Sequence, residues 1–315
     1  MTTMTAITTN PDGTLSPSAV ERPTPGPTEV LIKVAAAGVN PVDWKTRHGQ
    51  GVNAFFDPNA PMVLGWDVAG RVVEVGAGVT RLGVGNRVFG MPRFPRPASA
   101  YAEYVVAGSR EVARIPDSVT DIEAGALPLA ALTAWQAIVD SLRVGEGDRV
   151  LIHAASGGVG HLAVQIAKTR GAEVWGTASA AKHEELRAFG VDHPIDYRAE
   201  RFEEVATDMD AVLDLVGSDD YPIRSVRSLK RGGQLLVIPS PGQVPPQDVL
   251  DQAGVTASWM LVEPDYAALE QIARLLETGS LRVVVGDTRP LAQMAELHAI
   301  GEAGGPVGKL VATVD

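Results

Sequence analysis

Short apolar stretches separated by glycine and proline mark the first third of the chain. Their length, and the turn residues between them, are typical of strands rather than helices. Four stretches show this pattern most clearly, at residues 30–39, 66–76, 86–91 and 102–108. The sequence therefore predicts an all-β module in this region.

The spacing of the apolar positions changes at about residue 121. The segment 121–142 has helical spacing, and beyond it strands and helices alternate up to about residue 262. The expected strands are 150–155, 173–179, 211–217, 235–240 and 256–262, and the expected helices are 161–171, 182–190 and 223–233. The last fifty residues predict two more helices and two strands, at 281–285 and 309–314. Alternation of this kind predicts βαβ units and a parallel sheet covered on both faces.

Composition narrows the class of protein. The 315 residues suffice for about two domains, and 45% hydrophobic and 21% charged residues are typical of a folded chain. The formal net charge is −11, and a negatively charged protein is repelled by nucleic acid and by anionic membranes. Neither is therefore expected as a partner. The chain has no cysteine, and its first ten residues lack the basic and apolar regions of a secretion signal. A cytoplasmic location is therefore expected.

The strongest chemical signal is a glycine-rich turn between an expected strand and an expected helix. It has an A-x-G-x-x-G form and contains Ser156, Gly157, Gly158, Val159 and Gly160. Small residues in such a turn let the backbone approach a pyrophosphate, and the helix N-terminus offers free N–H groups to the anion. The turn therefore predicts a dinucleotide site in a Rossmann domain.

A different interpretation of the same turn is a degenerate nucleophile elbow. Ser156 would be the nucleophile, with Asp214 and His298 completing a hydrolase triad. A nucleophile elbow has the motif G-x-S-x-G, and the first glycine of that motif is Ala154 in this chain. In addition, acyl transfer gives no reason for a glycine at position 160. The serine hydrolase is kept as a remote alternative.

The end of the second strand of the fold indicates which dinucleotide is bound. An NAD-binding protein usually has an acidic residue there, which accepts hydrogen bonds from the ribose 2′-hydroxyl. This chain has Ala178, followed by Ser179 and Lys182, and a hydroxyl and an ammonium suit a 2′-phosphate. The sequence therefore favours NADP(H), although Ser179 could also be a simple helix cap and Lys182 a solvated charge.

With these motifs assembled, the chain resembles the zinc-free quinone oxidoreductase and enone reductase branch of the medium-chain dehydrogenase/reductase superfamily. The resemblance covers nearly the whole length and rests on several stretches in the family's order: residues 35–45, 64–79, 101–106, 125–137, the glycine turn, 213–217 and 308–315. It implies an α/β fold in which a GroES-like β-barrel domain, residues 1–120 and 263–315, encloses a Rossmann NADP-binding domain, residues 121–262. It also implies a homodimer.

The resemblance also shows that zinc ligands are missing. Zinc-dependent relatives have Gly-His-Glu where this chain has Gly65, Trp66 and Asp67, and their cysteine ligands have no counterpart here. No zinc site is therefore expected. Alcohol oxidation needs such a Lewis acid, whereas hydride donation to an already electrophilic acceptor does not.

The resemblance assigns further residues to the site. It implies cofactor contacts at Asn40, Thr133, Tyr197, Val216, Gly217, Ile238 and Ser240, in addition to the turn and to Ser179 and Lys182. Expected pocket residues are Trp44, Trp66, Asp67, Tyr101 and Trp259, since planar substrates stack on aromatic rings. Lys45 stands where many relatives have a tyrosine, and it either donates a hydrogen bond or proton to the substrate or is simply solvated.

The expected activity follows from these assignments. The chain would be an enzyme that transfers hydride from NADPH to a small-molecule quinone or to the β-carbon of an α,β-unsaturated carbonyl. A non-catalytic NADPH-binding protein of the same fold, used as a structural or sensor module, remains the alternative. The sequence does not identify the substrate.

Overall fold

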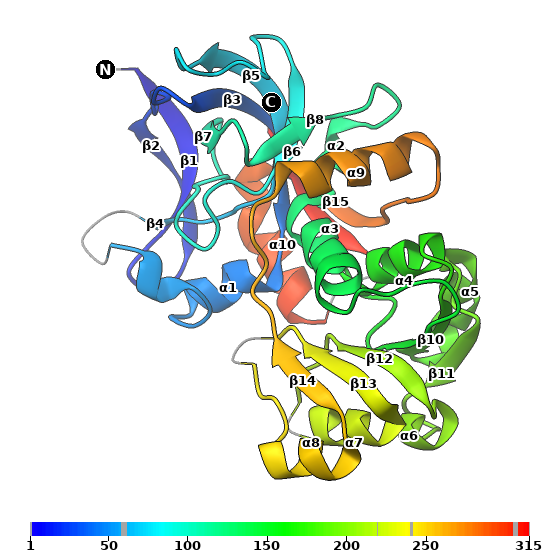
Figure 1. The fold of residues 1–315 in the computed structure, drawn as a ribbon. Helices are drawn as coiled ribbons and strands as arrows, with labels where there is room; N and C mark the ends of the chain where they lie inside the picture. Colours follow the sequence, from blue (N-terminus) through cyan, green and yellow to red (C-terminus); the bar gives the residue numbers. More distant parts are fainter. Residues whose placement is uncertain (1, 58–61, 219, 240–241, 305–307, 315) are drawn as a thin grey trace. The chain divides into compact units, whose positions relative to one another are not determined.

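The computed structural model describes residues 2–57, 62–218, 220–239, 242–304 and 308–314, and the chain forms two compact units (Figure 1). Unit 1 comprises Met1–Leu132 and Glu263–Asp315, and unit 2 comprises Thr133–Val262. Unit 1 is thus built from two separate segments of the chain, whereas unit 2 is one continuous segment. The division falls inside helix α3 (Pro128–Trp135).

Unit 1 is mainly β structure. Its strands are β1 (Thr3–Thr9), β2 (Leu15–Glu21), β3 (Glu29–Val39), β4 (Met62–Val63), β5 (Val68–Val75), β6 (Arg87–Gly90), β7 (Tyr104–Gly108), β8 (Val112–Arg114), β15 (Val285–Pro290) and β16 (Lys309–Thr313). Within the described residues, one sheet has the order β2-β1-β4 and the other has the order β15-β16-β3-β5-β6-β8, with β7 also paired to β3. The predicted all-β module is therefore present. Strand β16 completes it by pairing antiparallel to β3, with Leu310 opposite Val39.

The helices of unit 1 flank these sheets. Besides α3 they are α1 (Pro41–Arg47), α2 (Asp121–Ala126), α9 (Tyr266–Glu277) and α10 (Met294–Glu302), with short 3₁₀ turns η1 (Asn53–Phe55) and η4 (Leu291–Gln293). Pro41 occupies the first turn of α1, where its missing N–H costs nothing. Helix α1 lies against α10, where the rings of Trp44 and His298 meet edge to face with centroids 6.1 Å apart. Side chains of both helices thus extend the apolar core of the sheets.

Unit 2 is a doubly wound parallel sheet. Its strands are β9 (Arg149–Ile152), β10 (Glu173–Ala178), β11 (His193–Asp196), β12 (Met209–Asp214), β13 (Leu229–Val237) and β14 (Thr256–Trp259). Their order is β11-β10-β9-β12-β13-β14, and every neighbouring pair is parallel. This is the 3-2-1-4-5-6 order of a Rossmann domain, so the predicted fold class is confirmed. The order reverses between β9 and β12, where ligands bind in such sheets.

Helices cover both faces of this sheet. They are η2 (Gln136–Ser141, a π-helical turn), α4 (Gly160–Thr169), η3 (Ala180–Lys182, a 3₁₀ turn), α5 (His183–Phe189), α6 (Phe202–Val205), α7 (Tyr221–Ser228) and α8 (Gln247–Ala253). Figure 1 shows α4 and α5 on one face and α7 and α8 on the other. The predicted helix at 223–233 is wrong beyond Ser228, because Leu229 already pairs with Met209 and Gly232 has a φ of +82°.

Candidate cofactor and active site

The glycine-rich turn connects β9 to α4 in a tight, close-packed geometry. The Gly157 N–H donates to the Ala154 carbonyl at 2.9 Å, and α4 begins at Gly160. A Cβ at Gly160 would overlap the Ala154 carbonyl oxygen and lie 2.8 Å from the Ala155 Cα. Only glycine therefore allows the helix to start this close to the strand. At the start of α4 the His161 and Leu162 N–H groups donate to the Gly157 and Val159 carbonyls, each at 3.1 Å. A glycine turn that leads from a strand directly into a helix N-terminus is the arrangement that suits a pyrophosphate.

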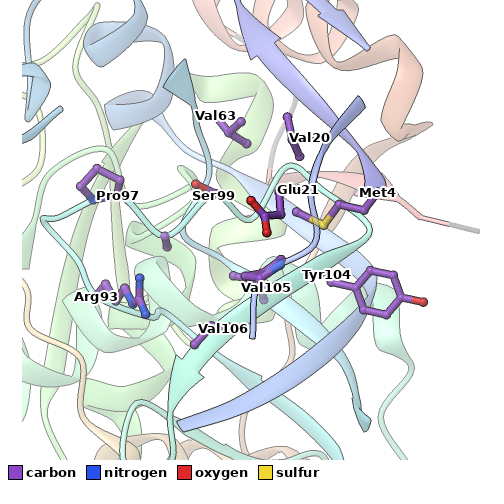
Figure 2. Close-up of a pocket in the computed structure, with 12 residues that line it drawn as sticks. Met4, Val20, Glu21, Val63, Arg93, Pro97, Ser99, Tyr104, Val105 and Val106 are labelled. Atoms are coloured by element: carbon purple, nitrogen blue, oxygen red, sulfur yellow. The ribbon is translucent and has the colours of Figure 1, made fainter. Parts of the chain in front are cut away.

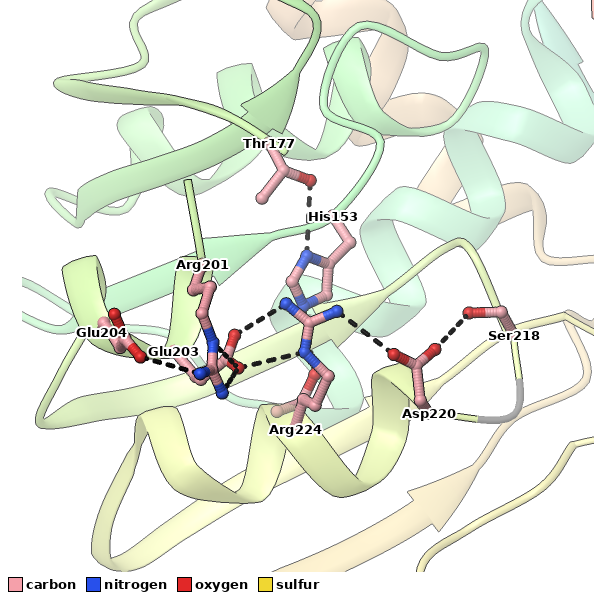
Figure 3. A network of polar contacts seen from close by, with 9 residues as sticks. His153, Thr177, Arg201, Glu203, Glu204, Ser218, Asp220 and Arg224 are labelled. Carbon is pink, nitrogen blue, oxygen red and sulfur yellow. Dashed lines mark hydrogen bonds and ion pairs between the residues drawn. The ribbon is translucent and has the colours of Figure 1, made fainter. Parts of the chain in front are cut away.

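Buried polar side chains hold the start of this turn (Figure 3). Thr177 Oγ1 accepts the Ala154 N–H at 3.1 Å, and Ala154 has a left-handed φ of +48°. The His153 ring lies between Thr177 Oγ1 at 3.3 Å and Ser225 Oγ at 3.1 Å. Burial and, to a lesser extent, the Arg224 charge lower the pKa of His153 to about 3. His153 is therefore a neutral support for the turn.

The carboxyl ends of β12 and β13 form the next part of the site. Asp214 Oδ1 accepts the N–H groups of Val216 at 2.8 Å and Gly217 at 3.1 Å, and the Ile238 N–H donates to the Asp214 carbonyl at 3.0 Å. Gly217 has a φ of +66°, and its Cα faces the Pro239 ring. The structure thus brings Val216, Gly217 and Ile238 together at one sheet edge. Ser240, also predicted as a cofactor residue, lies outside the described residues.

The members of the alternative hydrolase triad have other partners. Asp214 is used by its own turn in unit 2. His298 belongs to unit 1, where its Nε2 faces the Tyr101 hydroxyl at 3.4 Å and burial lowers its pKa to about 3. Ser156 is buried, with 6% of its surface exposed. These contacts give the hydrolase interpretation no support.

The end of β10 places the predicted NADP residues in one neighbourhood. Ala178 ends the strand, and the Ser179 hydroxyl makes no helix-capping hydrogen bond. The Lys182 N–H donates to the Ser179 carbonyl at 2.9 Å, and the Tyr197 N–H reaches the Ala178 carbonyl at 3.3 Å. Ser179, Lys182 and Tyr197 therefore lie around the carboxyl end of the same strand.

Unit 1 contains a buried polar cluster that sequence reasoning found only in part. Asn40 Nδ2 donates to Asp67 Oδ2 at 2.8 Å, while the Lys309 ammonium donates to Asn40 Oδ1 and lies 3.8 Å from Asp67. Asp43 Oδ2 accepts the Asn40 N–H at 2.6 Å and the Tyr101 hydroxyl at 2.7 Å. Both polar ends of the Asn40 side chain are thus fixed.

Burial dominates the electrostatics of this cluster. Desolvation raises the pKa of Asp43 to about 7, against its hydrogen bonds from Asn40 and Tyr101. It also raises the pKa of Asp67, and the Lys309 ammonium opposes that shift. No sequence pattern singles out Asp43 or Lys309, because a lysine on a strand and an aspartate in a first helical turn are usually exposed.

Two of the four predicted aromatic pocket residues are interior side chains. Trp66 and Tyr101 are fully buried, and the Trp66 ring packs on Phe56 and Phe94 while its N–H donates to the Arg96 carbonyl at 2.8 Å. Asp67, assigned to the same pocket, is fully buried as well. Their place in a substrate pocket stays a prediction.

The remaining predicted residues are distributed over both units. Lys45 and Trp44 are half-buried on α1 in unit 1. Thr133 is buried on α3, and Trp259 in unit 2 is 40% exposed, with Gly242 against its ring. The roles of these four residues also stay predictions.

A separate cavity of about 300 Å³ lies within unit 1 (Figure 2). Its wall is largely apolar, with Met4, Val20, Val63 and Val105, and Glu21 and Arg93 add charges. None of its lining residues belongs to the predicted site.

Within the described ranges, no three His, Asp or Glu side chains gather closely enough to hold a metal ion. In the same part of the chain, no helix combines the length and apolar character needed to cross a membrane.

Comparison with family models gives two matches. Residues 26–117 match the alcohol dehydrogenase GroES-like domain, and residues 189–311 match a family described as zinc-binding dehydrogenase. The first match supports the predicted GroES-like character of unit 1.

Individual relatives agree with these matches. The solved quinone oxidoreductase from Coxiella burnetii is 35% identical, with a TM-score of 0.91 and full coverage of both chains. The 2-methylene-furan-3-one reductase of Solanum lycopersicum is 32% identical over 292 residues, covering 90% of this chain and 71% of its own. The polyketide synthase GfsB of Streptomyces halstedii is 37% identical over 294 residues, covering 91% of this chain, but this chain spans only 5% of it.

Proposed function

Because the chain belongs to the medium-chain dehydrogenase/reductase superfamily and is homologous to quinone oxidoreductases, we propose that it is a zinc-independent, NADPH-dependent oxidoreductase. Its substrate would be a quinone or an α,β-unsaturated carbonyl compound, the latter accepting hydride at its β-carbon. The observation that carries this proposal is the close approach of α4 to β9 at Gly160, which excludes any side chain there. Close helix–strand packing at such a glycine is typical of turns that bind a dinucleotide pyrophosphate.

NADPH rather than NADH is supported by the end of β10. Ala178 leaves no carboxylate to accept hydrogen bonds from a ribose 2′-hydroxyl or to repel a 2′-phosphate. The Ser179 hydroxyl is not used for capping, and the Lys182 side chain adds a positive charge beside it. We therefore assign the ribose end of the cofactor to Ser179, Lys182 and Tyr197.

The remaining cofactor residues would position the reactive end. A bound nicotinamide cofactor supplies the hydride. Residues Ser156 to Gly160 would bind the pyrophosphate, and Val216, Gly217 and Ile238 would flank the ring. Asn40 and Thr133 would contact the nicotinamide and its ribose. Lys45 would stabilise the oxyanion or enolate by donating a hydrogen bond, which a side chain placed in advance does at little reorganisation cost.

We also propose a homodimer as the working form. Strand β14 ends the sheet order of unit 2, so within the described residues its outer edge has no partner strand. Trp259 and Leu261 there are 40% and 39% exposed. An open edge with apolar side chains is a surface that a second copy could cover. Light scattering after size-exclusion chromatography gives the mass directly.

The test of the activity is oxidation of NADPH followed at 340 nm with a substrate panel. The panel contains 1,4-benzoquinone, 9,10-phenanthrenequinone, an alkenal, a cyclic enone and a simple ketone, and NADH runs in parallel. Turnover of quinones or enones with NADPH would support the proposal. Tight NADPH binding with no turnover would favour the non-catalytic alternative. The Ser156→Ala variant tests the hydrolase alternative, because an esterase would lose all turnover whereas a reductase should keep most of its cofactor affinity.

A further inference from the structure

The charged residues near the carboxyl edge of the unit 2 sheet differ in how they are paired. Arg201 and Arg224 both bind Glu203, at 2.9 and 2.8 Å, and the side chain of Glu203 is only 3% exposed (Figure 3). Arg224 also contacts Asp220 at 3.2 Å. Carboxylates therefore already neutralise these two guanidinium groups, so they are poor candidates for binding an anionic ligand.

Arg198 and Lys182 are different. Within the described part of the chain, neither side chain makes an ion pair. Arg198 is exposed, and its Nε donates to the Tyr197 hydroxyl oxygen at 3.2 Å. That bond uses the Nε–H, one of the five guanidinium N–H groups. The N–H groups of the two terminal nitrogens stay available for an acceptor with two oxygens.

The backbone places Arg198 next to the end of β10. Asp196 pairs in register with Ala178, and the Tyr197 N–H reaches the Ala178 carbonyl at 3.3 Å. Arg198 follows directly, in the turn after β11, which is the strand adjacent to the one that leads into Ser179 and Lys182. The backbone thus brings Lys182 and Arg198, each from the turn after its own strand, to the same end of the sheet as Ser179.

The acidic residues beside Arg198 are occupied by backbone groups. Asp196 Oδ1 accepts the Arg198 N–H at 3.1 Å, and Glu200 Oε1 accepts the Asp196 N–H at 3.0 Å. The Glu200 N–H closes the turn on the Asp196 carbonyl at 2.8 Å. This turn fixes the backbone conformation at Arg198. It also uses one carboxylate oxygen of Asp196 and one of Glu200 as acceptors for backbone N–H groups.

We propose that Arg198 is a specificity-determining residue that binds the 2′-phosphate of NADPH together with Ser179 and Lys182. This inference rests on the proposed function and extends it to a residue that no sequence motif marks. Tyr197 has a second role here, because its hydroxyl orients the guanidinium. A phosphate monoester with nearly two negative charges suits two unpaired cations, whereas the neutral 2′-hydroxyl of NADH does not.

The experiment compares dissociation constants of NADPH and NADH for the wild type, Arg198→Gln and Arg198→Lys, measured by fluorescence titration of the full chain. For Arg198→Gln we expect NADPH to bind about 10- to 100-fold more weakly, as for a lost hydrogen bond to a charged group, and NADH to change less than about twofold. Arg198→Lys should recover only part of the loss, because an ammonium lacks the planar fork.

A matched control removes the same charge at a distance. Arg187 is exposed in the last turn of α5, away from Ser179, so Arg187→Gln should leave both dissociation constants within about twofold of wild type. Calorimetric titration with 2′,5′-ADP tests the phosphate contact without the nicotinamide. An unchanged NADH constant in Arg198→Gln shows at the same time that the variant is folded.

The outcomes separate the two proposals. If the wild type prefers NADPH and Arg198→Gln keeps that preference, the role of Arg198 is overturned while the proposed function stands. If the wild type binds NADPH no better than NADH, or binds neither, the assignment of NADPH fails and the role of Arg198 with it. A loss confined to NADPH and 2′,5′-ADP supports the inference.

Discussion

Gly160 shows how one residue can determine whether a site forms. A Cβ at this position has no free space, because the Ala154 carbonyl and the Ala155 backbone fill it. Gly160→Ala should therefore lower the free energy of unfolding by at least about 2 kcal/mol and weaken NADPH binding, since α4 must move away from β9. Urea denaturation and cofactor titration measure the two effects.

The control for this prediction is a glycine with open space around it. At Gly83 a Cβ would meet no atom within 4 Å, so Gly83→Ala should change stability by less than about 0.5 kcal/mol. Equal effects of the two substitutions would contradict the packing argument.

Buried histidine and aspartate side chains predict how stability depends on pH. Burial lowers the pKa of His153 and His298 from 6.5 to about 3, so the unfolded chain binds more protons between these values. The contribution of these two histidines to the free energy of unfolding is complete above pH 6.5 and is lost as the pH falls toward 3. Asp43 acts oppositely: its pKa is raised from 3.8 to about 7, so its contribution is complete below pH 3.8 and is lost as the pH rises through 7.

Single substitutions separate these opposing contributions. His153→Gln should reduce the loss of stability between pH 6.5 and pH 4, and Asp43→Asn should reduce the loss between pH 4 and pH 7. Urea midpoints at pH 4, 5.5 and 7 provide the measurement. Parallel pH profiles for the wild type and both variants would show that neither group titrates as described.

At the scale of elements, the ion pair of Lys309 and Asp67 joins β16 to the loop before β5. Lys309→Met keeps the length of the side chain but leaves the Asp67 carboxyl buried without its cation, so we expect a loss of about 3–5 kcal/mol in the free energy of unfolding. Adding Asp67→Asn should recover much of that loss. Lys33→Met on β3 is the exposed control. If it costs as much as Lys309→Met, the burial argument is wrong.

Elements with a strong local signal were predictable from the sequence. Helix α4 and strands β10 and β16 agree with their expected ranges to within two residues, because apolar periodicity and glycine caps determine their bounds. Strand β15 was expected at 281–285 and lies at Val285–Pro290, where no position is buried and the sequence includes glycine, proline and three polar residues. Strands β1 and β2 were missed for the same reason, since half-exposed threonines and serines resemble a loop.

The candidate site was predictable where it depends on neighbours in sequence. The glycine turn and the end of β10 are local motifs, and the structure brings their residues together. The cluster of Asn40, Asp43, Asp67 and Lys309 depends on contacts between distant segments, which no local spacing encodes. Asn40 and Asp67 could be named from the sequence only with the help of the family resemblance, and Asp43 and Lys309 could not be named at all.

At the scale of the whole molecule, each unit has its own apolar core, and the predicted cofactor residues at the glycine turn and at the carboxyl ends of β10 to β13 belong to unit 2. NADPH at 100 times its dissociation constant should therefore stabilise unit 2 by about 2.7 kcal/mol. Hydrogen exchange followed by mass spectrometry should show greater protection in peptides from β9 to β13 than in peptides from β1 and β2. Equal gains in both sets would contradict this localisation.

The discontinuous construction of unit 1 has a consequence for synthesis on the ribosome. Unit 2 is complete once residue 262 has emerged, whereas β3 lacks its neighbour β16 until residues 309–313 have been made. Until then Asp67 also lacks the ammonium of Lys309, so the nascent first segment has an open strand edge and an uncompensated carboxyl group. Unit 2 can thus fold before unit 1, and β16 later completes the unit whose first segment was made earlier.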